Sequence, residues 1–214
     1  MPVTLKLATS LDGRIATAGG LSRWITGEAA REAVHRLRAE HDVVLIGVGT
    51  ALADDPELTV RLMDYRGRQP ARVVLDSRQR LSPKSKLARS AREIPTYVVA
   101  ANAPEPALIE AGVRVLRVEA IDANRPKLRD VIDALAAEGL TRLFVEGGGQ
   151  VAGSFLSEGL VDAIEWFRAP MVLGAEGLPG VGELAVATLA AAPHFRRVEV
   201  HEVGPDLWER YVRA

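Results

Sequence analysis

The feature that most constrains this chain is a glycine-rich turn between an apolar strand and a helix. Residues 143–156 read Leu-Phe-Val-Glu-Gly-Gly-Gly-Gln-Val-Ala-Gly-Ser-Phe-Leu, so the strand pattern ends at Glu146 and a helix pattern follows the glycines. Glycine lets the backbone bend sharply and approach a ligand, and the helix N-terminus adds partial positive charge, which suits a phosphate. The turn therefore predicts an anion site at the end of a strand in an α/β fold.

The turn also fits Gly147-x-Gly149-x-x-Ala152, the fingerprint of dinucleotide-binding Rossmann domains. Such a domain opens with this turn and needs several strand–helix units after it. Only about sixty residues follow the turn here, and their patterns are mostly antiparallel. We therefore expect a cofactor-phosphate site on another kind of α/β fold.

Apolar strand patterns alternate with helix patterns over the first two thirds of the chain. Strands are predicted at 3–8, 42–47, 72–76, 96–100, 113–118 and 142–146. Helices are predicted from an N-cap at Thr26 through Leu37, and at 49–55, 105–111, 126–138 and 149–157. This alternation predicts a three-layer αβα architecture, in which helices cover both faces of a mostly parallel central sheet.

The last third of the chain has a different pattern. Three strand patterns, at 164–172, 196–203 and 207–212, follow without amphipathic helices between them, and the last two are joined by a tight turn at 204–206. We expect antiparallel strands here, and a short helix or a loop at 185–192. No repeat or linker divides the sequence, so a single domain over residues 1–214 is predicted.

The composition argues against several classes of protein. Hydrophobic residues make up 48% of the chain, enough for a substantial core, and the net charge is −1. Basic and acidic residues are interleaved, which gives no surface typical of nucleic-acid or membrane binding. Cysteine is absent, and the four histidines lack metal-binding spacing, so we predict no disulfide, no thiol nucleophile and no metal. A cytoplasmic location is compatible with these observations.

Several segments in the same order resemble one family. They are residues 5–16, 22–26, 50–61 (which contain Ala-Asp-Asp-Pro), 74–77 and the glycine turn. Arg38, between the second and third segments, belongs to the same pattern, as do residues 170–174 and 203–206 after the glycine turn. Together they resemble the reductase domain of the bifunctional riboflavin-biosynthesis deaminase/reductase over nearly the whole chain. The resemblance implies a dihydrofolate-reductase-like fold. It also implies reduction of 5-amino-6-(5-phosphoribosylamino)uracil by NADPH, with hydride transfer to C1 of the ring-opened ribose.

The family's bifunctional members carry a zinc deaminase domain first, and this sequence contains none of the cysteine ligands that such a domain needs. We therefore expect a reductase domain without a deaminase domain. Another protein would then supply the deamination. Relatives suggest a homodimer.

The resemblance assigns a phosphorylated small molecule to a group of substrate-binding residues. These are Ser22, Arg38, Leu58, Arg61 and Glu146. The planar fork of arginine favours phosphate, and a carboxylate at a strand end can accept paired N–H groups from a pyrimidine edge. The alternatives are that the arginines are solvated surface residues and that Glu146 caps nearby backbone.

Lys6, Asp54 and Glu146 are the candidate catalytic residues. Lys6 interrupts an apolar strand, so it either hydrogen-bonds the sugar or extends its amine out to solvent. Asp54 is a candidate for assisting proton movement near the transferred hydride.

The resemblance also assigns residues to the cofactor. These are Ala8, Trp24, Thr50, Asp54, Ser77, Gly148, Gly149, Gln150, Val151, Ala152, Gly153 and Ser154. Ser77 lies beside Arg78 and Arg80, which favour the 2′-phosphate of NADPH, whereas Asp76 alone would favour NADH. Trp24 has an alternative role as a packing residue before the first helix.

Two other functions stay open. One is a related reductase that acts on a diamino-pyrimidinone ribosyl phosphate or a pterin-like substrate. The other is a module that binds a nucleotide without catalysis, against which the presence of Lys6, Asp54 and Glu146 together argues.

Overall fold

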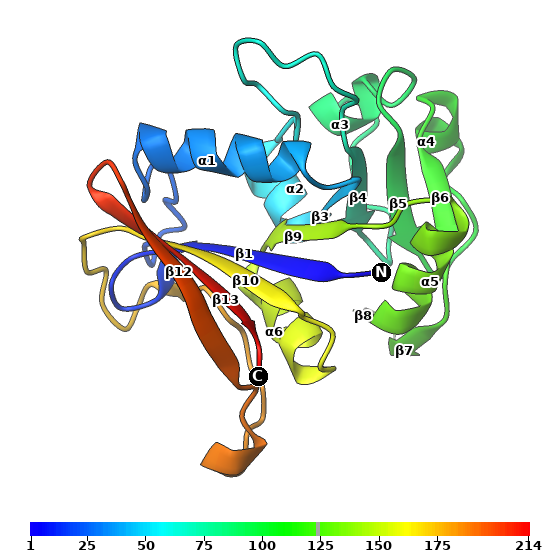
Figure 1. Cartoon of the computed structure of the whole chain (residues 1–214). Coiled ribbons are helices and arrows are strands. Elements are labelled where there is room, and N and C mark those ends of the chain that lie inside the picture. The colour runs from blue at the N-terminus through cyan, green and yellow to red at the C-terminus, as the bar shows by residue number, and fades with distance from the viewer. Residues whose placement is uncertain (123–124) are drawn as a thin grey trace. The chain divides into compact units, whose positions relative to one another are not determined.

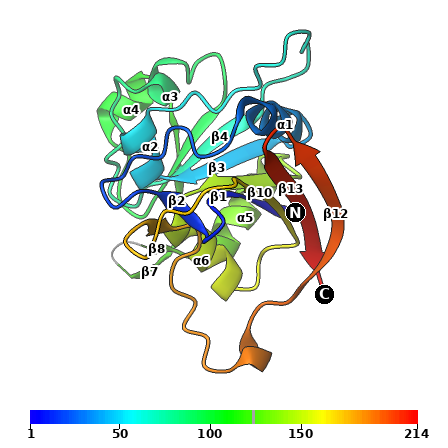
Figure 2. The same ribbon diagram turned by 90° about the vertical axis from the view of Figure 1, so that its left-hand side faces the viewer.

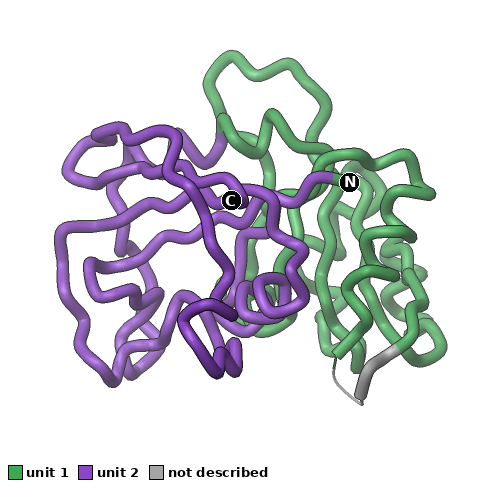
Figure 3. Tube along the Cα trace, turned by 60° about the horizontal axis from the view of Figure 1, so that its bottom comes forward, with its two compact units in different colours: residues 1, 36–144 green, residues 2–35, 145–214 purple. Residues whose placement is uncertain are grey.

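The computed structural model describes residues 1–122 and 125–214, which form two compact units (Figure 3). Unit 1 comprises Met1 and residues 36–144, and unit 2 comprises residues 2–35 and 145–214. Helix α1 (Glu28–Ala39) runs from unit 2 into unit 1, and strand β9 (Leu143–Gly147) runs from unit 1 back into unit 2. The fold class is α/β, with a mostly parallel sheet and antiparallel strands near the C-terminus, as predicted.

Unit 1 is built on four parallel strands in the order β3, β4, β5, β6 (Figure 1). Their bounds are Val43–Gly47, Ala71–Leu75, Thr96–Ala100 and Arg114–Arg117. The helices are α2 (Val48–Asp54), α3 (Lys86–Arg89), α4 (Pro106–Glu110) and α5 (Leu128–Ala137), and β7 (Ala120–Asp122) pairs with β8 (Arg125–Pro126). Residues 43–46 are at most 1% exposed, which explains why the sequence shows a continuous apolar run there.

Unit 2 pairs β1 (Val3–Thr9) with β10 (Ala163–Arg168) in parallel. Strands β13 (Asp206–Arg213) and β12 (Phe195–Val203) then add in antiparallel order and form the long curved hairpin in Figure 2. Helix α6 spans Gly149–Ser157, and β2 (Arg14–Ala16) pairs with β11 (Leu178–Pro179). The chain between β11 and β12 contains the 3-10 turn Leu189–Ala191, which is the orange helix at the bottom of Figures 1 and 2.

Most predicted elements are confirmed, and the differences have local causes. Helix α1 begins at Glu28, so Gly27 rather than Thr26 is at the N-cap, and Arg31 N–H donates to the Gly27 carbonyl. Strand β10 ends at Arg168, four residues early, because the following backbone bonds to the β1–β2 turn through Leu11 N–H and the Met171 carbonyl. The patterns did not indicate the short elements β2, β7, β8, β11 and α3.

Each unit has its own core. In unit 1, Val73, Val74, Val98 and Val99 are fully buried, and in unit 2 Phe155 and Phe167 are. Burying one such side chain stabilises the fold by about 1.5–3 kcal/mol. Within the described part of the chain, no helix combines the length and the apolar character needed to cross a membrane.

Candidate active site

The glycine turn bends where the sequence predicts. Gly148 has a φ of 89°, which residues with a side chain rarely adopt, and it is the N-cap of α6 without a side-chain cap hydrogen bond. The first N–H groups of a helix have no partner within the helix, and the glycine at the N-cap has no side chain that could accept from them. Such an end can bind a phosphate. Of the predicted residues 148–154, Ala152 and Gly153 lie in the buried packing of α6 rather than at this end.

A second glycine-containing segment, residues 177–182, packs against the start of α6. A Cβ atom at Gly149 would lie 2.3 Å from the carbonyl oxygen of Pro179, and one at Gly153 would lie 3.1 Å from the carbonyl carbon of Gly182. Gly182 N–H donates to the Gly149 carbonyl over 2.7 Å. The chain's own packing thus requires glycine at 149, a reason that the sequence did not indicate.

The 177–182 segment is also tied to the β1–β2 turn. Gly180 N–H donates to the carbonyl of Gly13 over 2.9 Å. In the same turn, Asp12 accepts hydrogen bonds from the Ser10 hydroxyl at 2.6 Å and from the N–H groups of Leu173 and Gly174. These bonds, the Ser10 hydroxyl first, lower the pKa of Asp12 to about 2. The carboxylate therefore connects the turn to the chain that follows β10.

In unit 1, the segment 57–61 carries two of the predicted substrate residues. Leu58 has a φ of 56° and its side chain is 4% exposed, so a ligand contact at this position would come from its backbone. Arg61 is exposed and lies 3.2 Å from Glu57. Arg38, at the end of α1, donates to the Thr59 carbonyl over 2.9 Å. Leu58 and Arg61 thus lie on one segment, and Arg38 is bonded to that segment from α1.

Arg72 on β4 supports this segment from inside unit 1. Its guanidinium is fully buried and donates to the carbonyl of Glu57 at 3.3 Å and to the hydroxyl of Thr96 at 2.6 Å. It also donates to Ser90 and to the carbonyls of Leu87 and Ile94. Burial lowers the pKa of Arg72 to about 10, so it is charged at neutral pH. The sequence alone did not identify Arg72 as a supporting residue.

The predicted cofactor residues of unit 1 follow two neighbouring strands. Thr50 and Asp54 lie four residues apart on α2, directly after β3, and both are half-buried. Ser77 is buried just after β4. The carboxylate of Asp76 accepts from Leu81 N–H at 2.7 Å and lies 3.8 Å from the guanidinium of Arg80, so it holds its own turn. Because the Asp76 carboxylate already has these partners, it is less suited to bind the free 2′-hydroxyl of NADH.

In unit 2, the remaining predicted residues lie on several elements. Lys6 and Ala8 are on β1, and Glu146 is near the end of β9, where it is the one residue of the strand that is not buried. Ser22, half-buried, and Trp24 are in the loop before α1. Trp24 is 67% exposed with the guanidinium of Arg31 4.4 Å from its ring centre, so it does not act as a packing residue.

Lys6 has a neighbourhood that its sequence context did not indicate. It is in register with Glu165 of β10, which is in register with Arg210 of β13, so the three share one face of the sheet. Glu165 is 2% exposed and accepts from the indole N–H of Trp208 at 2.7 Å. Lys6 therefore lies in a row of alternating charge, and its role in catalysis stays a prediction.

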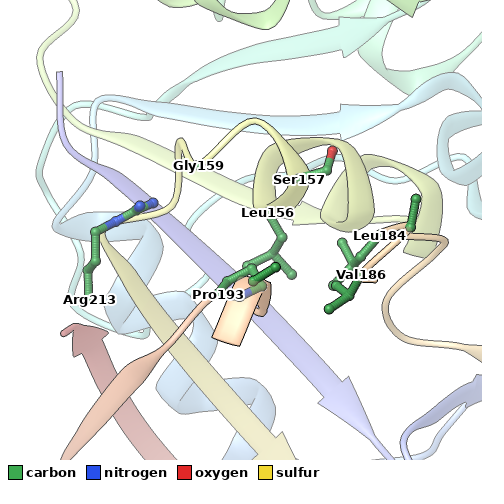
Figure 4. Close-up of a pocket in the computed structure, with 9 residues that line it drawn as sticks. Leu156, Ser157, Gly159, Leu184, Val186, Pro193 and Arg213 are labelled. Carbon is green, nitrogen blue, oxygen red and sulfur yellow. The ribbon is translucent and has the colours of Figure 1, made fainter. Parts of the chain in front are cut away.

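The hollow drawn in Figure 4 is not part of this candidate site. It has a volume of about 280 Å³ and lies at the C-terminal end of α6, between Leu156, Leu184 and Pro193. None of the predicted site residues lines it. Over residues 1–122 and 125–214, no three His, Cys, Asp or Glu side chains are grouped as a metal site requires.

Comparison with known proteins identifies the family. Residues 2–208 match the family model described as the RibD C-terminal domain. The chain belongs to this family. The predicted family is thereby confirmed, and the RibD C-terminal domain accounts for almost the whole chain.

Individual relatives agree. The chain is 38% identical over 207 residues to riboflavin biosynthesis protein RibD of Aquifex aeolicus, covering 96% of this chain and 56% of that protein. It is 40% identical over 174 residues to the 2,5-diamino-6-ribosylamino-4(3H)-pyrimidinone 5′-phosphate reductase of Methanothermobacter thermautotrophicus, covering 80% and 79%. The structure of Acinetobacter baumannii RibD, form 2, superimposes with a TM-score of 0.88 at 30% identity, covering 100% of this chain and 58% of that one. The chain thus spans a little over half the length of the RibD proteins it matches.

Proposed function

We propose that this chain reduces the ribosyl group of 5-amino-6-(5-phosphoribosylamino)uracil to the ribitylamino product, with NADPH, in riboflavin biosynthesis. Membership of the RibD C-terminal domain family supports this proposal. The observation that carries it is that Arg38, one of the two predicted phosphate ligands, bonds to the Thr59 carbonyl, two residues before the other, Arg61. Two arginines, one on this segment and one bonded to it, suit a phosphate ester.

The remaining substrate groups follow from the same assignment. Glu146 would accept N–H groups of the pyrimidine edge, because it is the partly exposed residue of an otherwise buried strand. Leu58 would contribute backbone groups, and Ser22 its hydroxyl. Lys6 would donate a hydrogen bond to the sugar oxygen or the imine nitrogen, and Asp54 would assist proton movement during the reduction.

The residues present fit a dinucleotide phosphate. The N-terminus of α6 has a glycine N-cap without a side-chain cap, and the first N–H groups of a helix that begins in this way suit an anion. Arg78 and Arg80 are exposed beside Ser77, which suits a 2′-phosphate and favours NADPH over NADH. When bound, the cofactor supplies the hydride. The chain binds and orients the nicotinamide, with Trp24, Thr50 and Ala8 as the predicted contacts.

A second candidate substrate has specific support. The Methanothermobacter relative is named for a diamino-ribosylamino-pyrimidinone phosphate, and this chain matches 79% of its length. The two substrates share the ribosyl phosphate and differ at the pyrimidine, so Arg38 and Arg61 serve both. The values of kcat/KM for the two pyrimidines, measured side by side, decide between them.

The test follows NADPH consumption with each phosphorylated substrate and with its dephosphorylated form. Arg61→Ala should raise the KM for the phosphorylated substrate about tenfold or more, because a charge-assisted bond contributes about 1.5–3 kcal/mol. The Kd of NADPH, measured by fluorescence titration, should stay unchanged. Arg66→Ala, an exposed arginine of the same loop, is the matched control. The assignment would be contradicted if Arg61→Ala weakened the binding of substrate and NADPH equally. It would also be contradicted if the wild type reduced the dephosphorylated substrate as efficiently as the phosphorylated one.

We also propose a cytoplasmic homodimer. Val198 and Val200 on β12 are 37% and 47% exposed on the outermost strand of the hairpin, which gives a second copy an apolar surface. Light scattering on the purified chain tests the dimer, and a monomer at micromolar concentration would exclude it.

A further inference from the structure

The loop that follows Arg61 is closed at its neck by one side chain. The side-chain oxygen of Gln69 accepts from Val60 N–H over 2.7 Å, and its side-chain nitrogen donates to the Val60 carbonyl over 3.1 Å. Both backbone groups of Val60 are thus paired, as they would be with a neighbouring strand. The residues between them are exposed or half-buried, and Met63 is 94% exposed.

The 57–61 segment before this neck has an alternating pattern. Leu58 and Val60 are 4% and 5% exposed, whereas Glu57 and Arg61 are exposed. The buried pair therefore anchors the segment, and the outer pair is accessible to solvent. Arg38 and Arg72 hold the Thr59 and Glu57 carbonyls, and Gln69 holds the last anchored residue, directly before Arg61.

We infer that Gln69 is a positioning residue for the substrate phosphate: by fixing the backbone of Val60, it sets the direction in which Arg61 leaves the segment. This inference rests on the proposed function, in which Arg61 binds that phosphate. A neutral amide suits the task, since it donates and accepts at once. Glutamate at this position would lose the donor and place a negative charge near the anion.

A substitution at Gln69 distinguishes an effect on the position of Arg61 from an effect on stability better than a substitution at Arg72 would. Arg72 bonds to five groups of β5, α3 and the chain around them, so its loss would disturb much of unit 1. Gln69→Met keeps the length of the side chain and removes both bonds to Val60. Asp42→Ala is a matched stability control, because Asp42 accepts bonds from Thr141 and Arg142 before β3, at the opposite end of the strand from α2.

The experiment is a double-mutant cycle on the full chain with the phosphorylated substrate. Gln69→Met should raise KM about fivefold or more, with kcat and the NADPH Kd within about twofold. In an Arg61→Ala background the same change should raise KM less than about twofold, because Gln69 acts through Arg61. Gln69→Glu should raise KM at least as much as Gln69→Met. Asp42→Ala should lower the melting temperature and leave KM unchanged.

Two results would overturn the inference. One is a wild-type KM in Gln69→Met alongside a lowered melting temperature, which would give Gln69 a structural role only. The other is a KM increase of the same factor with and without Arg61, which would separate Gln69 from the phosphate. In both cases the proposed function stands if the wild type turns over the phosphorylated substrate. A wild type that turns over neither phosphorylated pyrimidine refutes the proposed function, and the inference with it.

Discussion

Gly149→Ala tests the packing of the 177–182 segment on the glycine turn. The new Cβ atom would lie 2.3 Å from the Pro179 carbonyl oxygen, about 1 Å short of ordinary contact. The obstacle is backbone, so the segment must move, and the 2.7 Å bond from Gly182 N–H to the Gly149 carbonyl would be strained or lost. Overpacking of this kind costs about 1–3 kcal/mol.

Gly49→Ala is the matched control. Gly49 is near the start of α2, and a Cβ atom there meets nothing within 4 Å. Alanine at a compatible position stabilises by about 0.4–1 kcal/mol, so the two substitutions should have opposite signs. For a chain of this size, each kcal/mol shifts the melting temperature by about 2–4 °C, which scanning calorimetry resolves.

The NADPH Kd of each variant should be measured as well, since a displaced 177–182 segment would disturb the start of α6 where we place the pyrophosphate. Hydrogen exchange at Gly182 reports on the segment directly and should be faster in Gly149→Ala. A Gly149→Ala variant that melts at or above the wild-type temperature, with Gly182 N–H still protected, would refute the reasoning.

Three further predictions concern single side chains. The pKa of Asp12, lowered to about 2 from 3.8, means that its stabilising bonds are present above about pH 4 and are lost as the pH falls towards 2. The melting temperature of Asp12→Asn should therefore depend less on pH over that range than that of the wild type. If the two proteins show the same dependence of melting temperature on pH, the carboxylate does not contribute to stability. Glu57→Gln should lower the KM for the phosphorylated substrate by up to about fivefold, since an exposed ion pair that competes for Arg61 contributes about 0.2–1 kcal/mol. A raised KM would argue that Glu57 orients Arg61 instead. Arg72→Lys should lower the free energy of unfolding, measured with urea, by about 1–3 kcal/mol or more, because a single ammonium group cannot reach all five acceptors. Wild-type stability would mean that water replaces the lost donors.

The sequence by itself determined the order and type of the main elements. Strand β3 is a buried apolar run, α6 starts at the third of three glycines, and a tight turn at 204–206 joins two strands. Backbone preferences and periodicity over a few residues are enough to determine each of these. The order of these local motifs was also enough to recognise the family and to propose that Arg38 and Arg61 bind the substrate phosphate.

Only the tertiary structure decided what each of these residues packs against. Gly149 is adjacent to Pro179, Lys6 is in register with Glu165, and Gln69 pairs with Val60 across a loop. Such contacts join residues that are remote along the chain or separated by an irregular loop, and no periodic pattern encodes them. They depend on how the elements pack, because a buried polar group takes whichever partner the fold brings within hydrogen-bond distance.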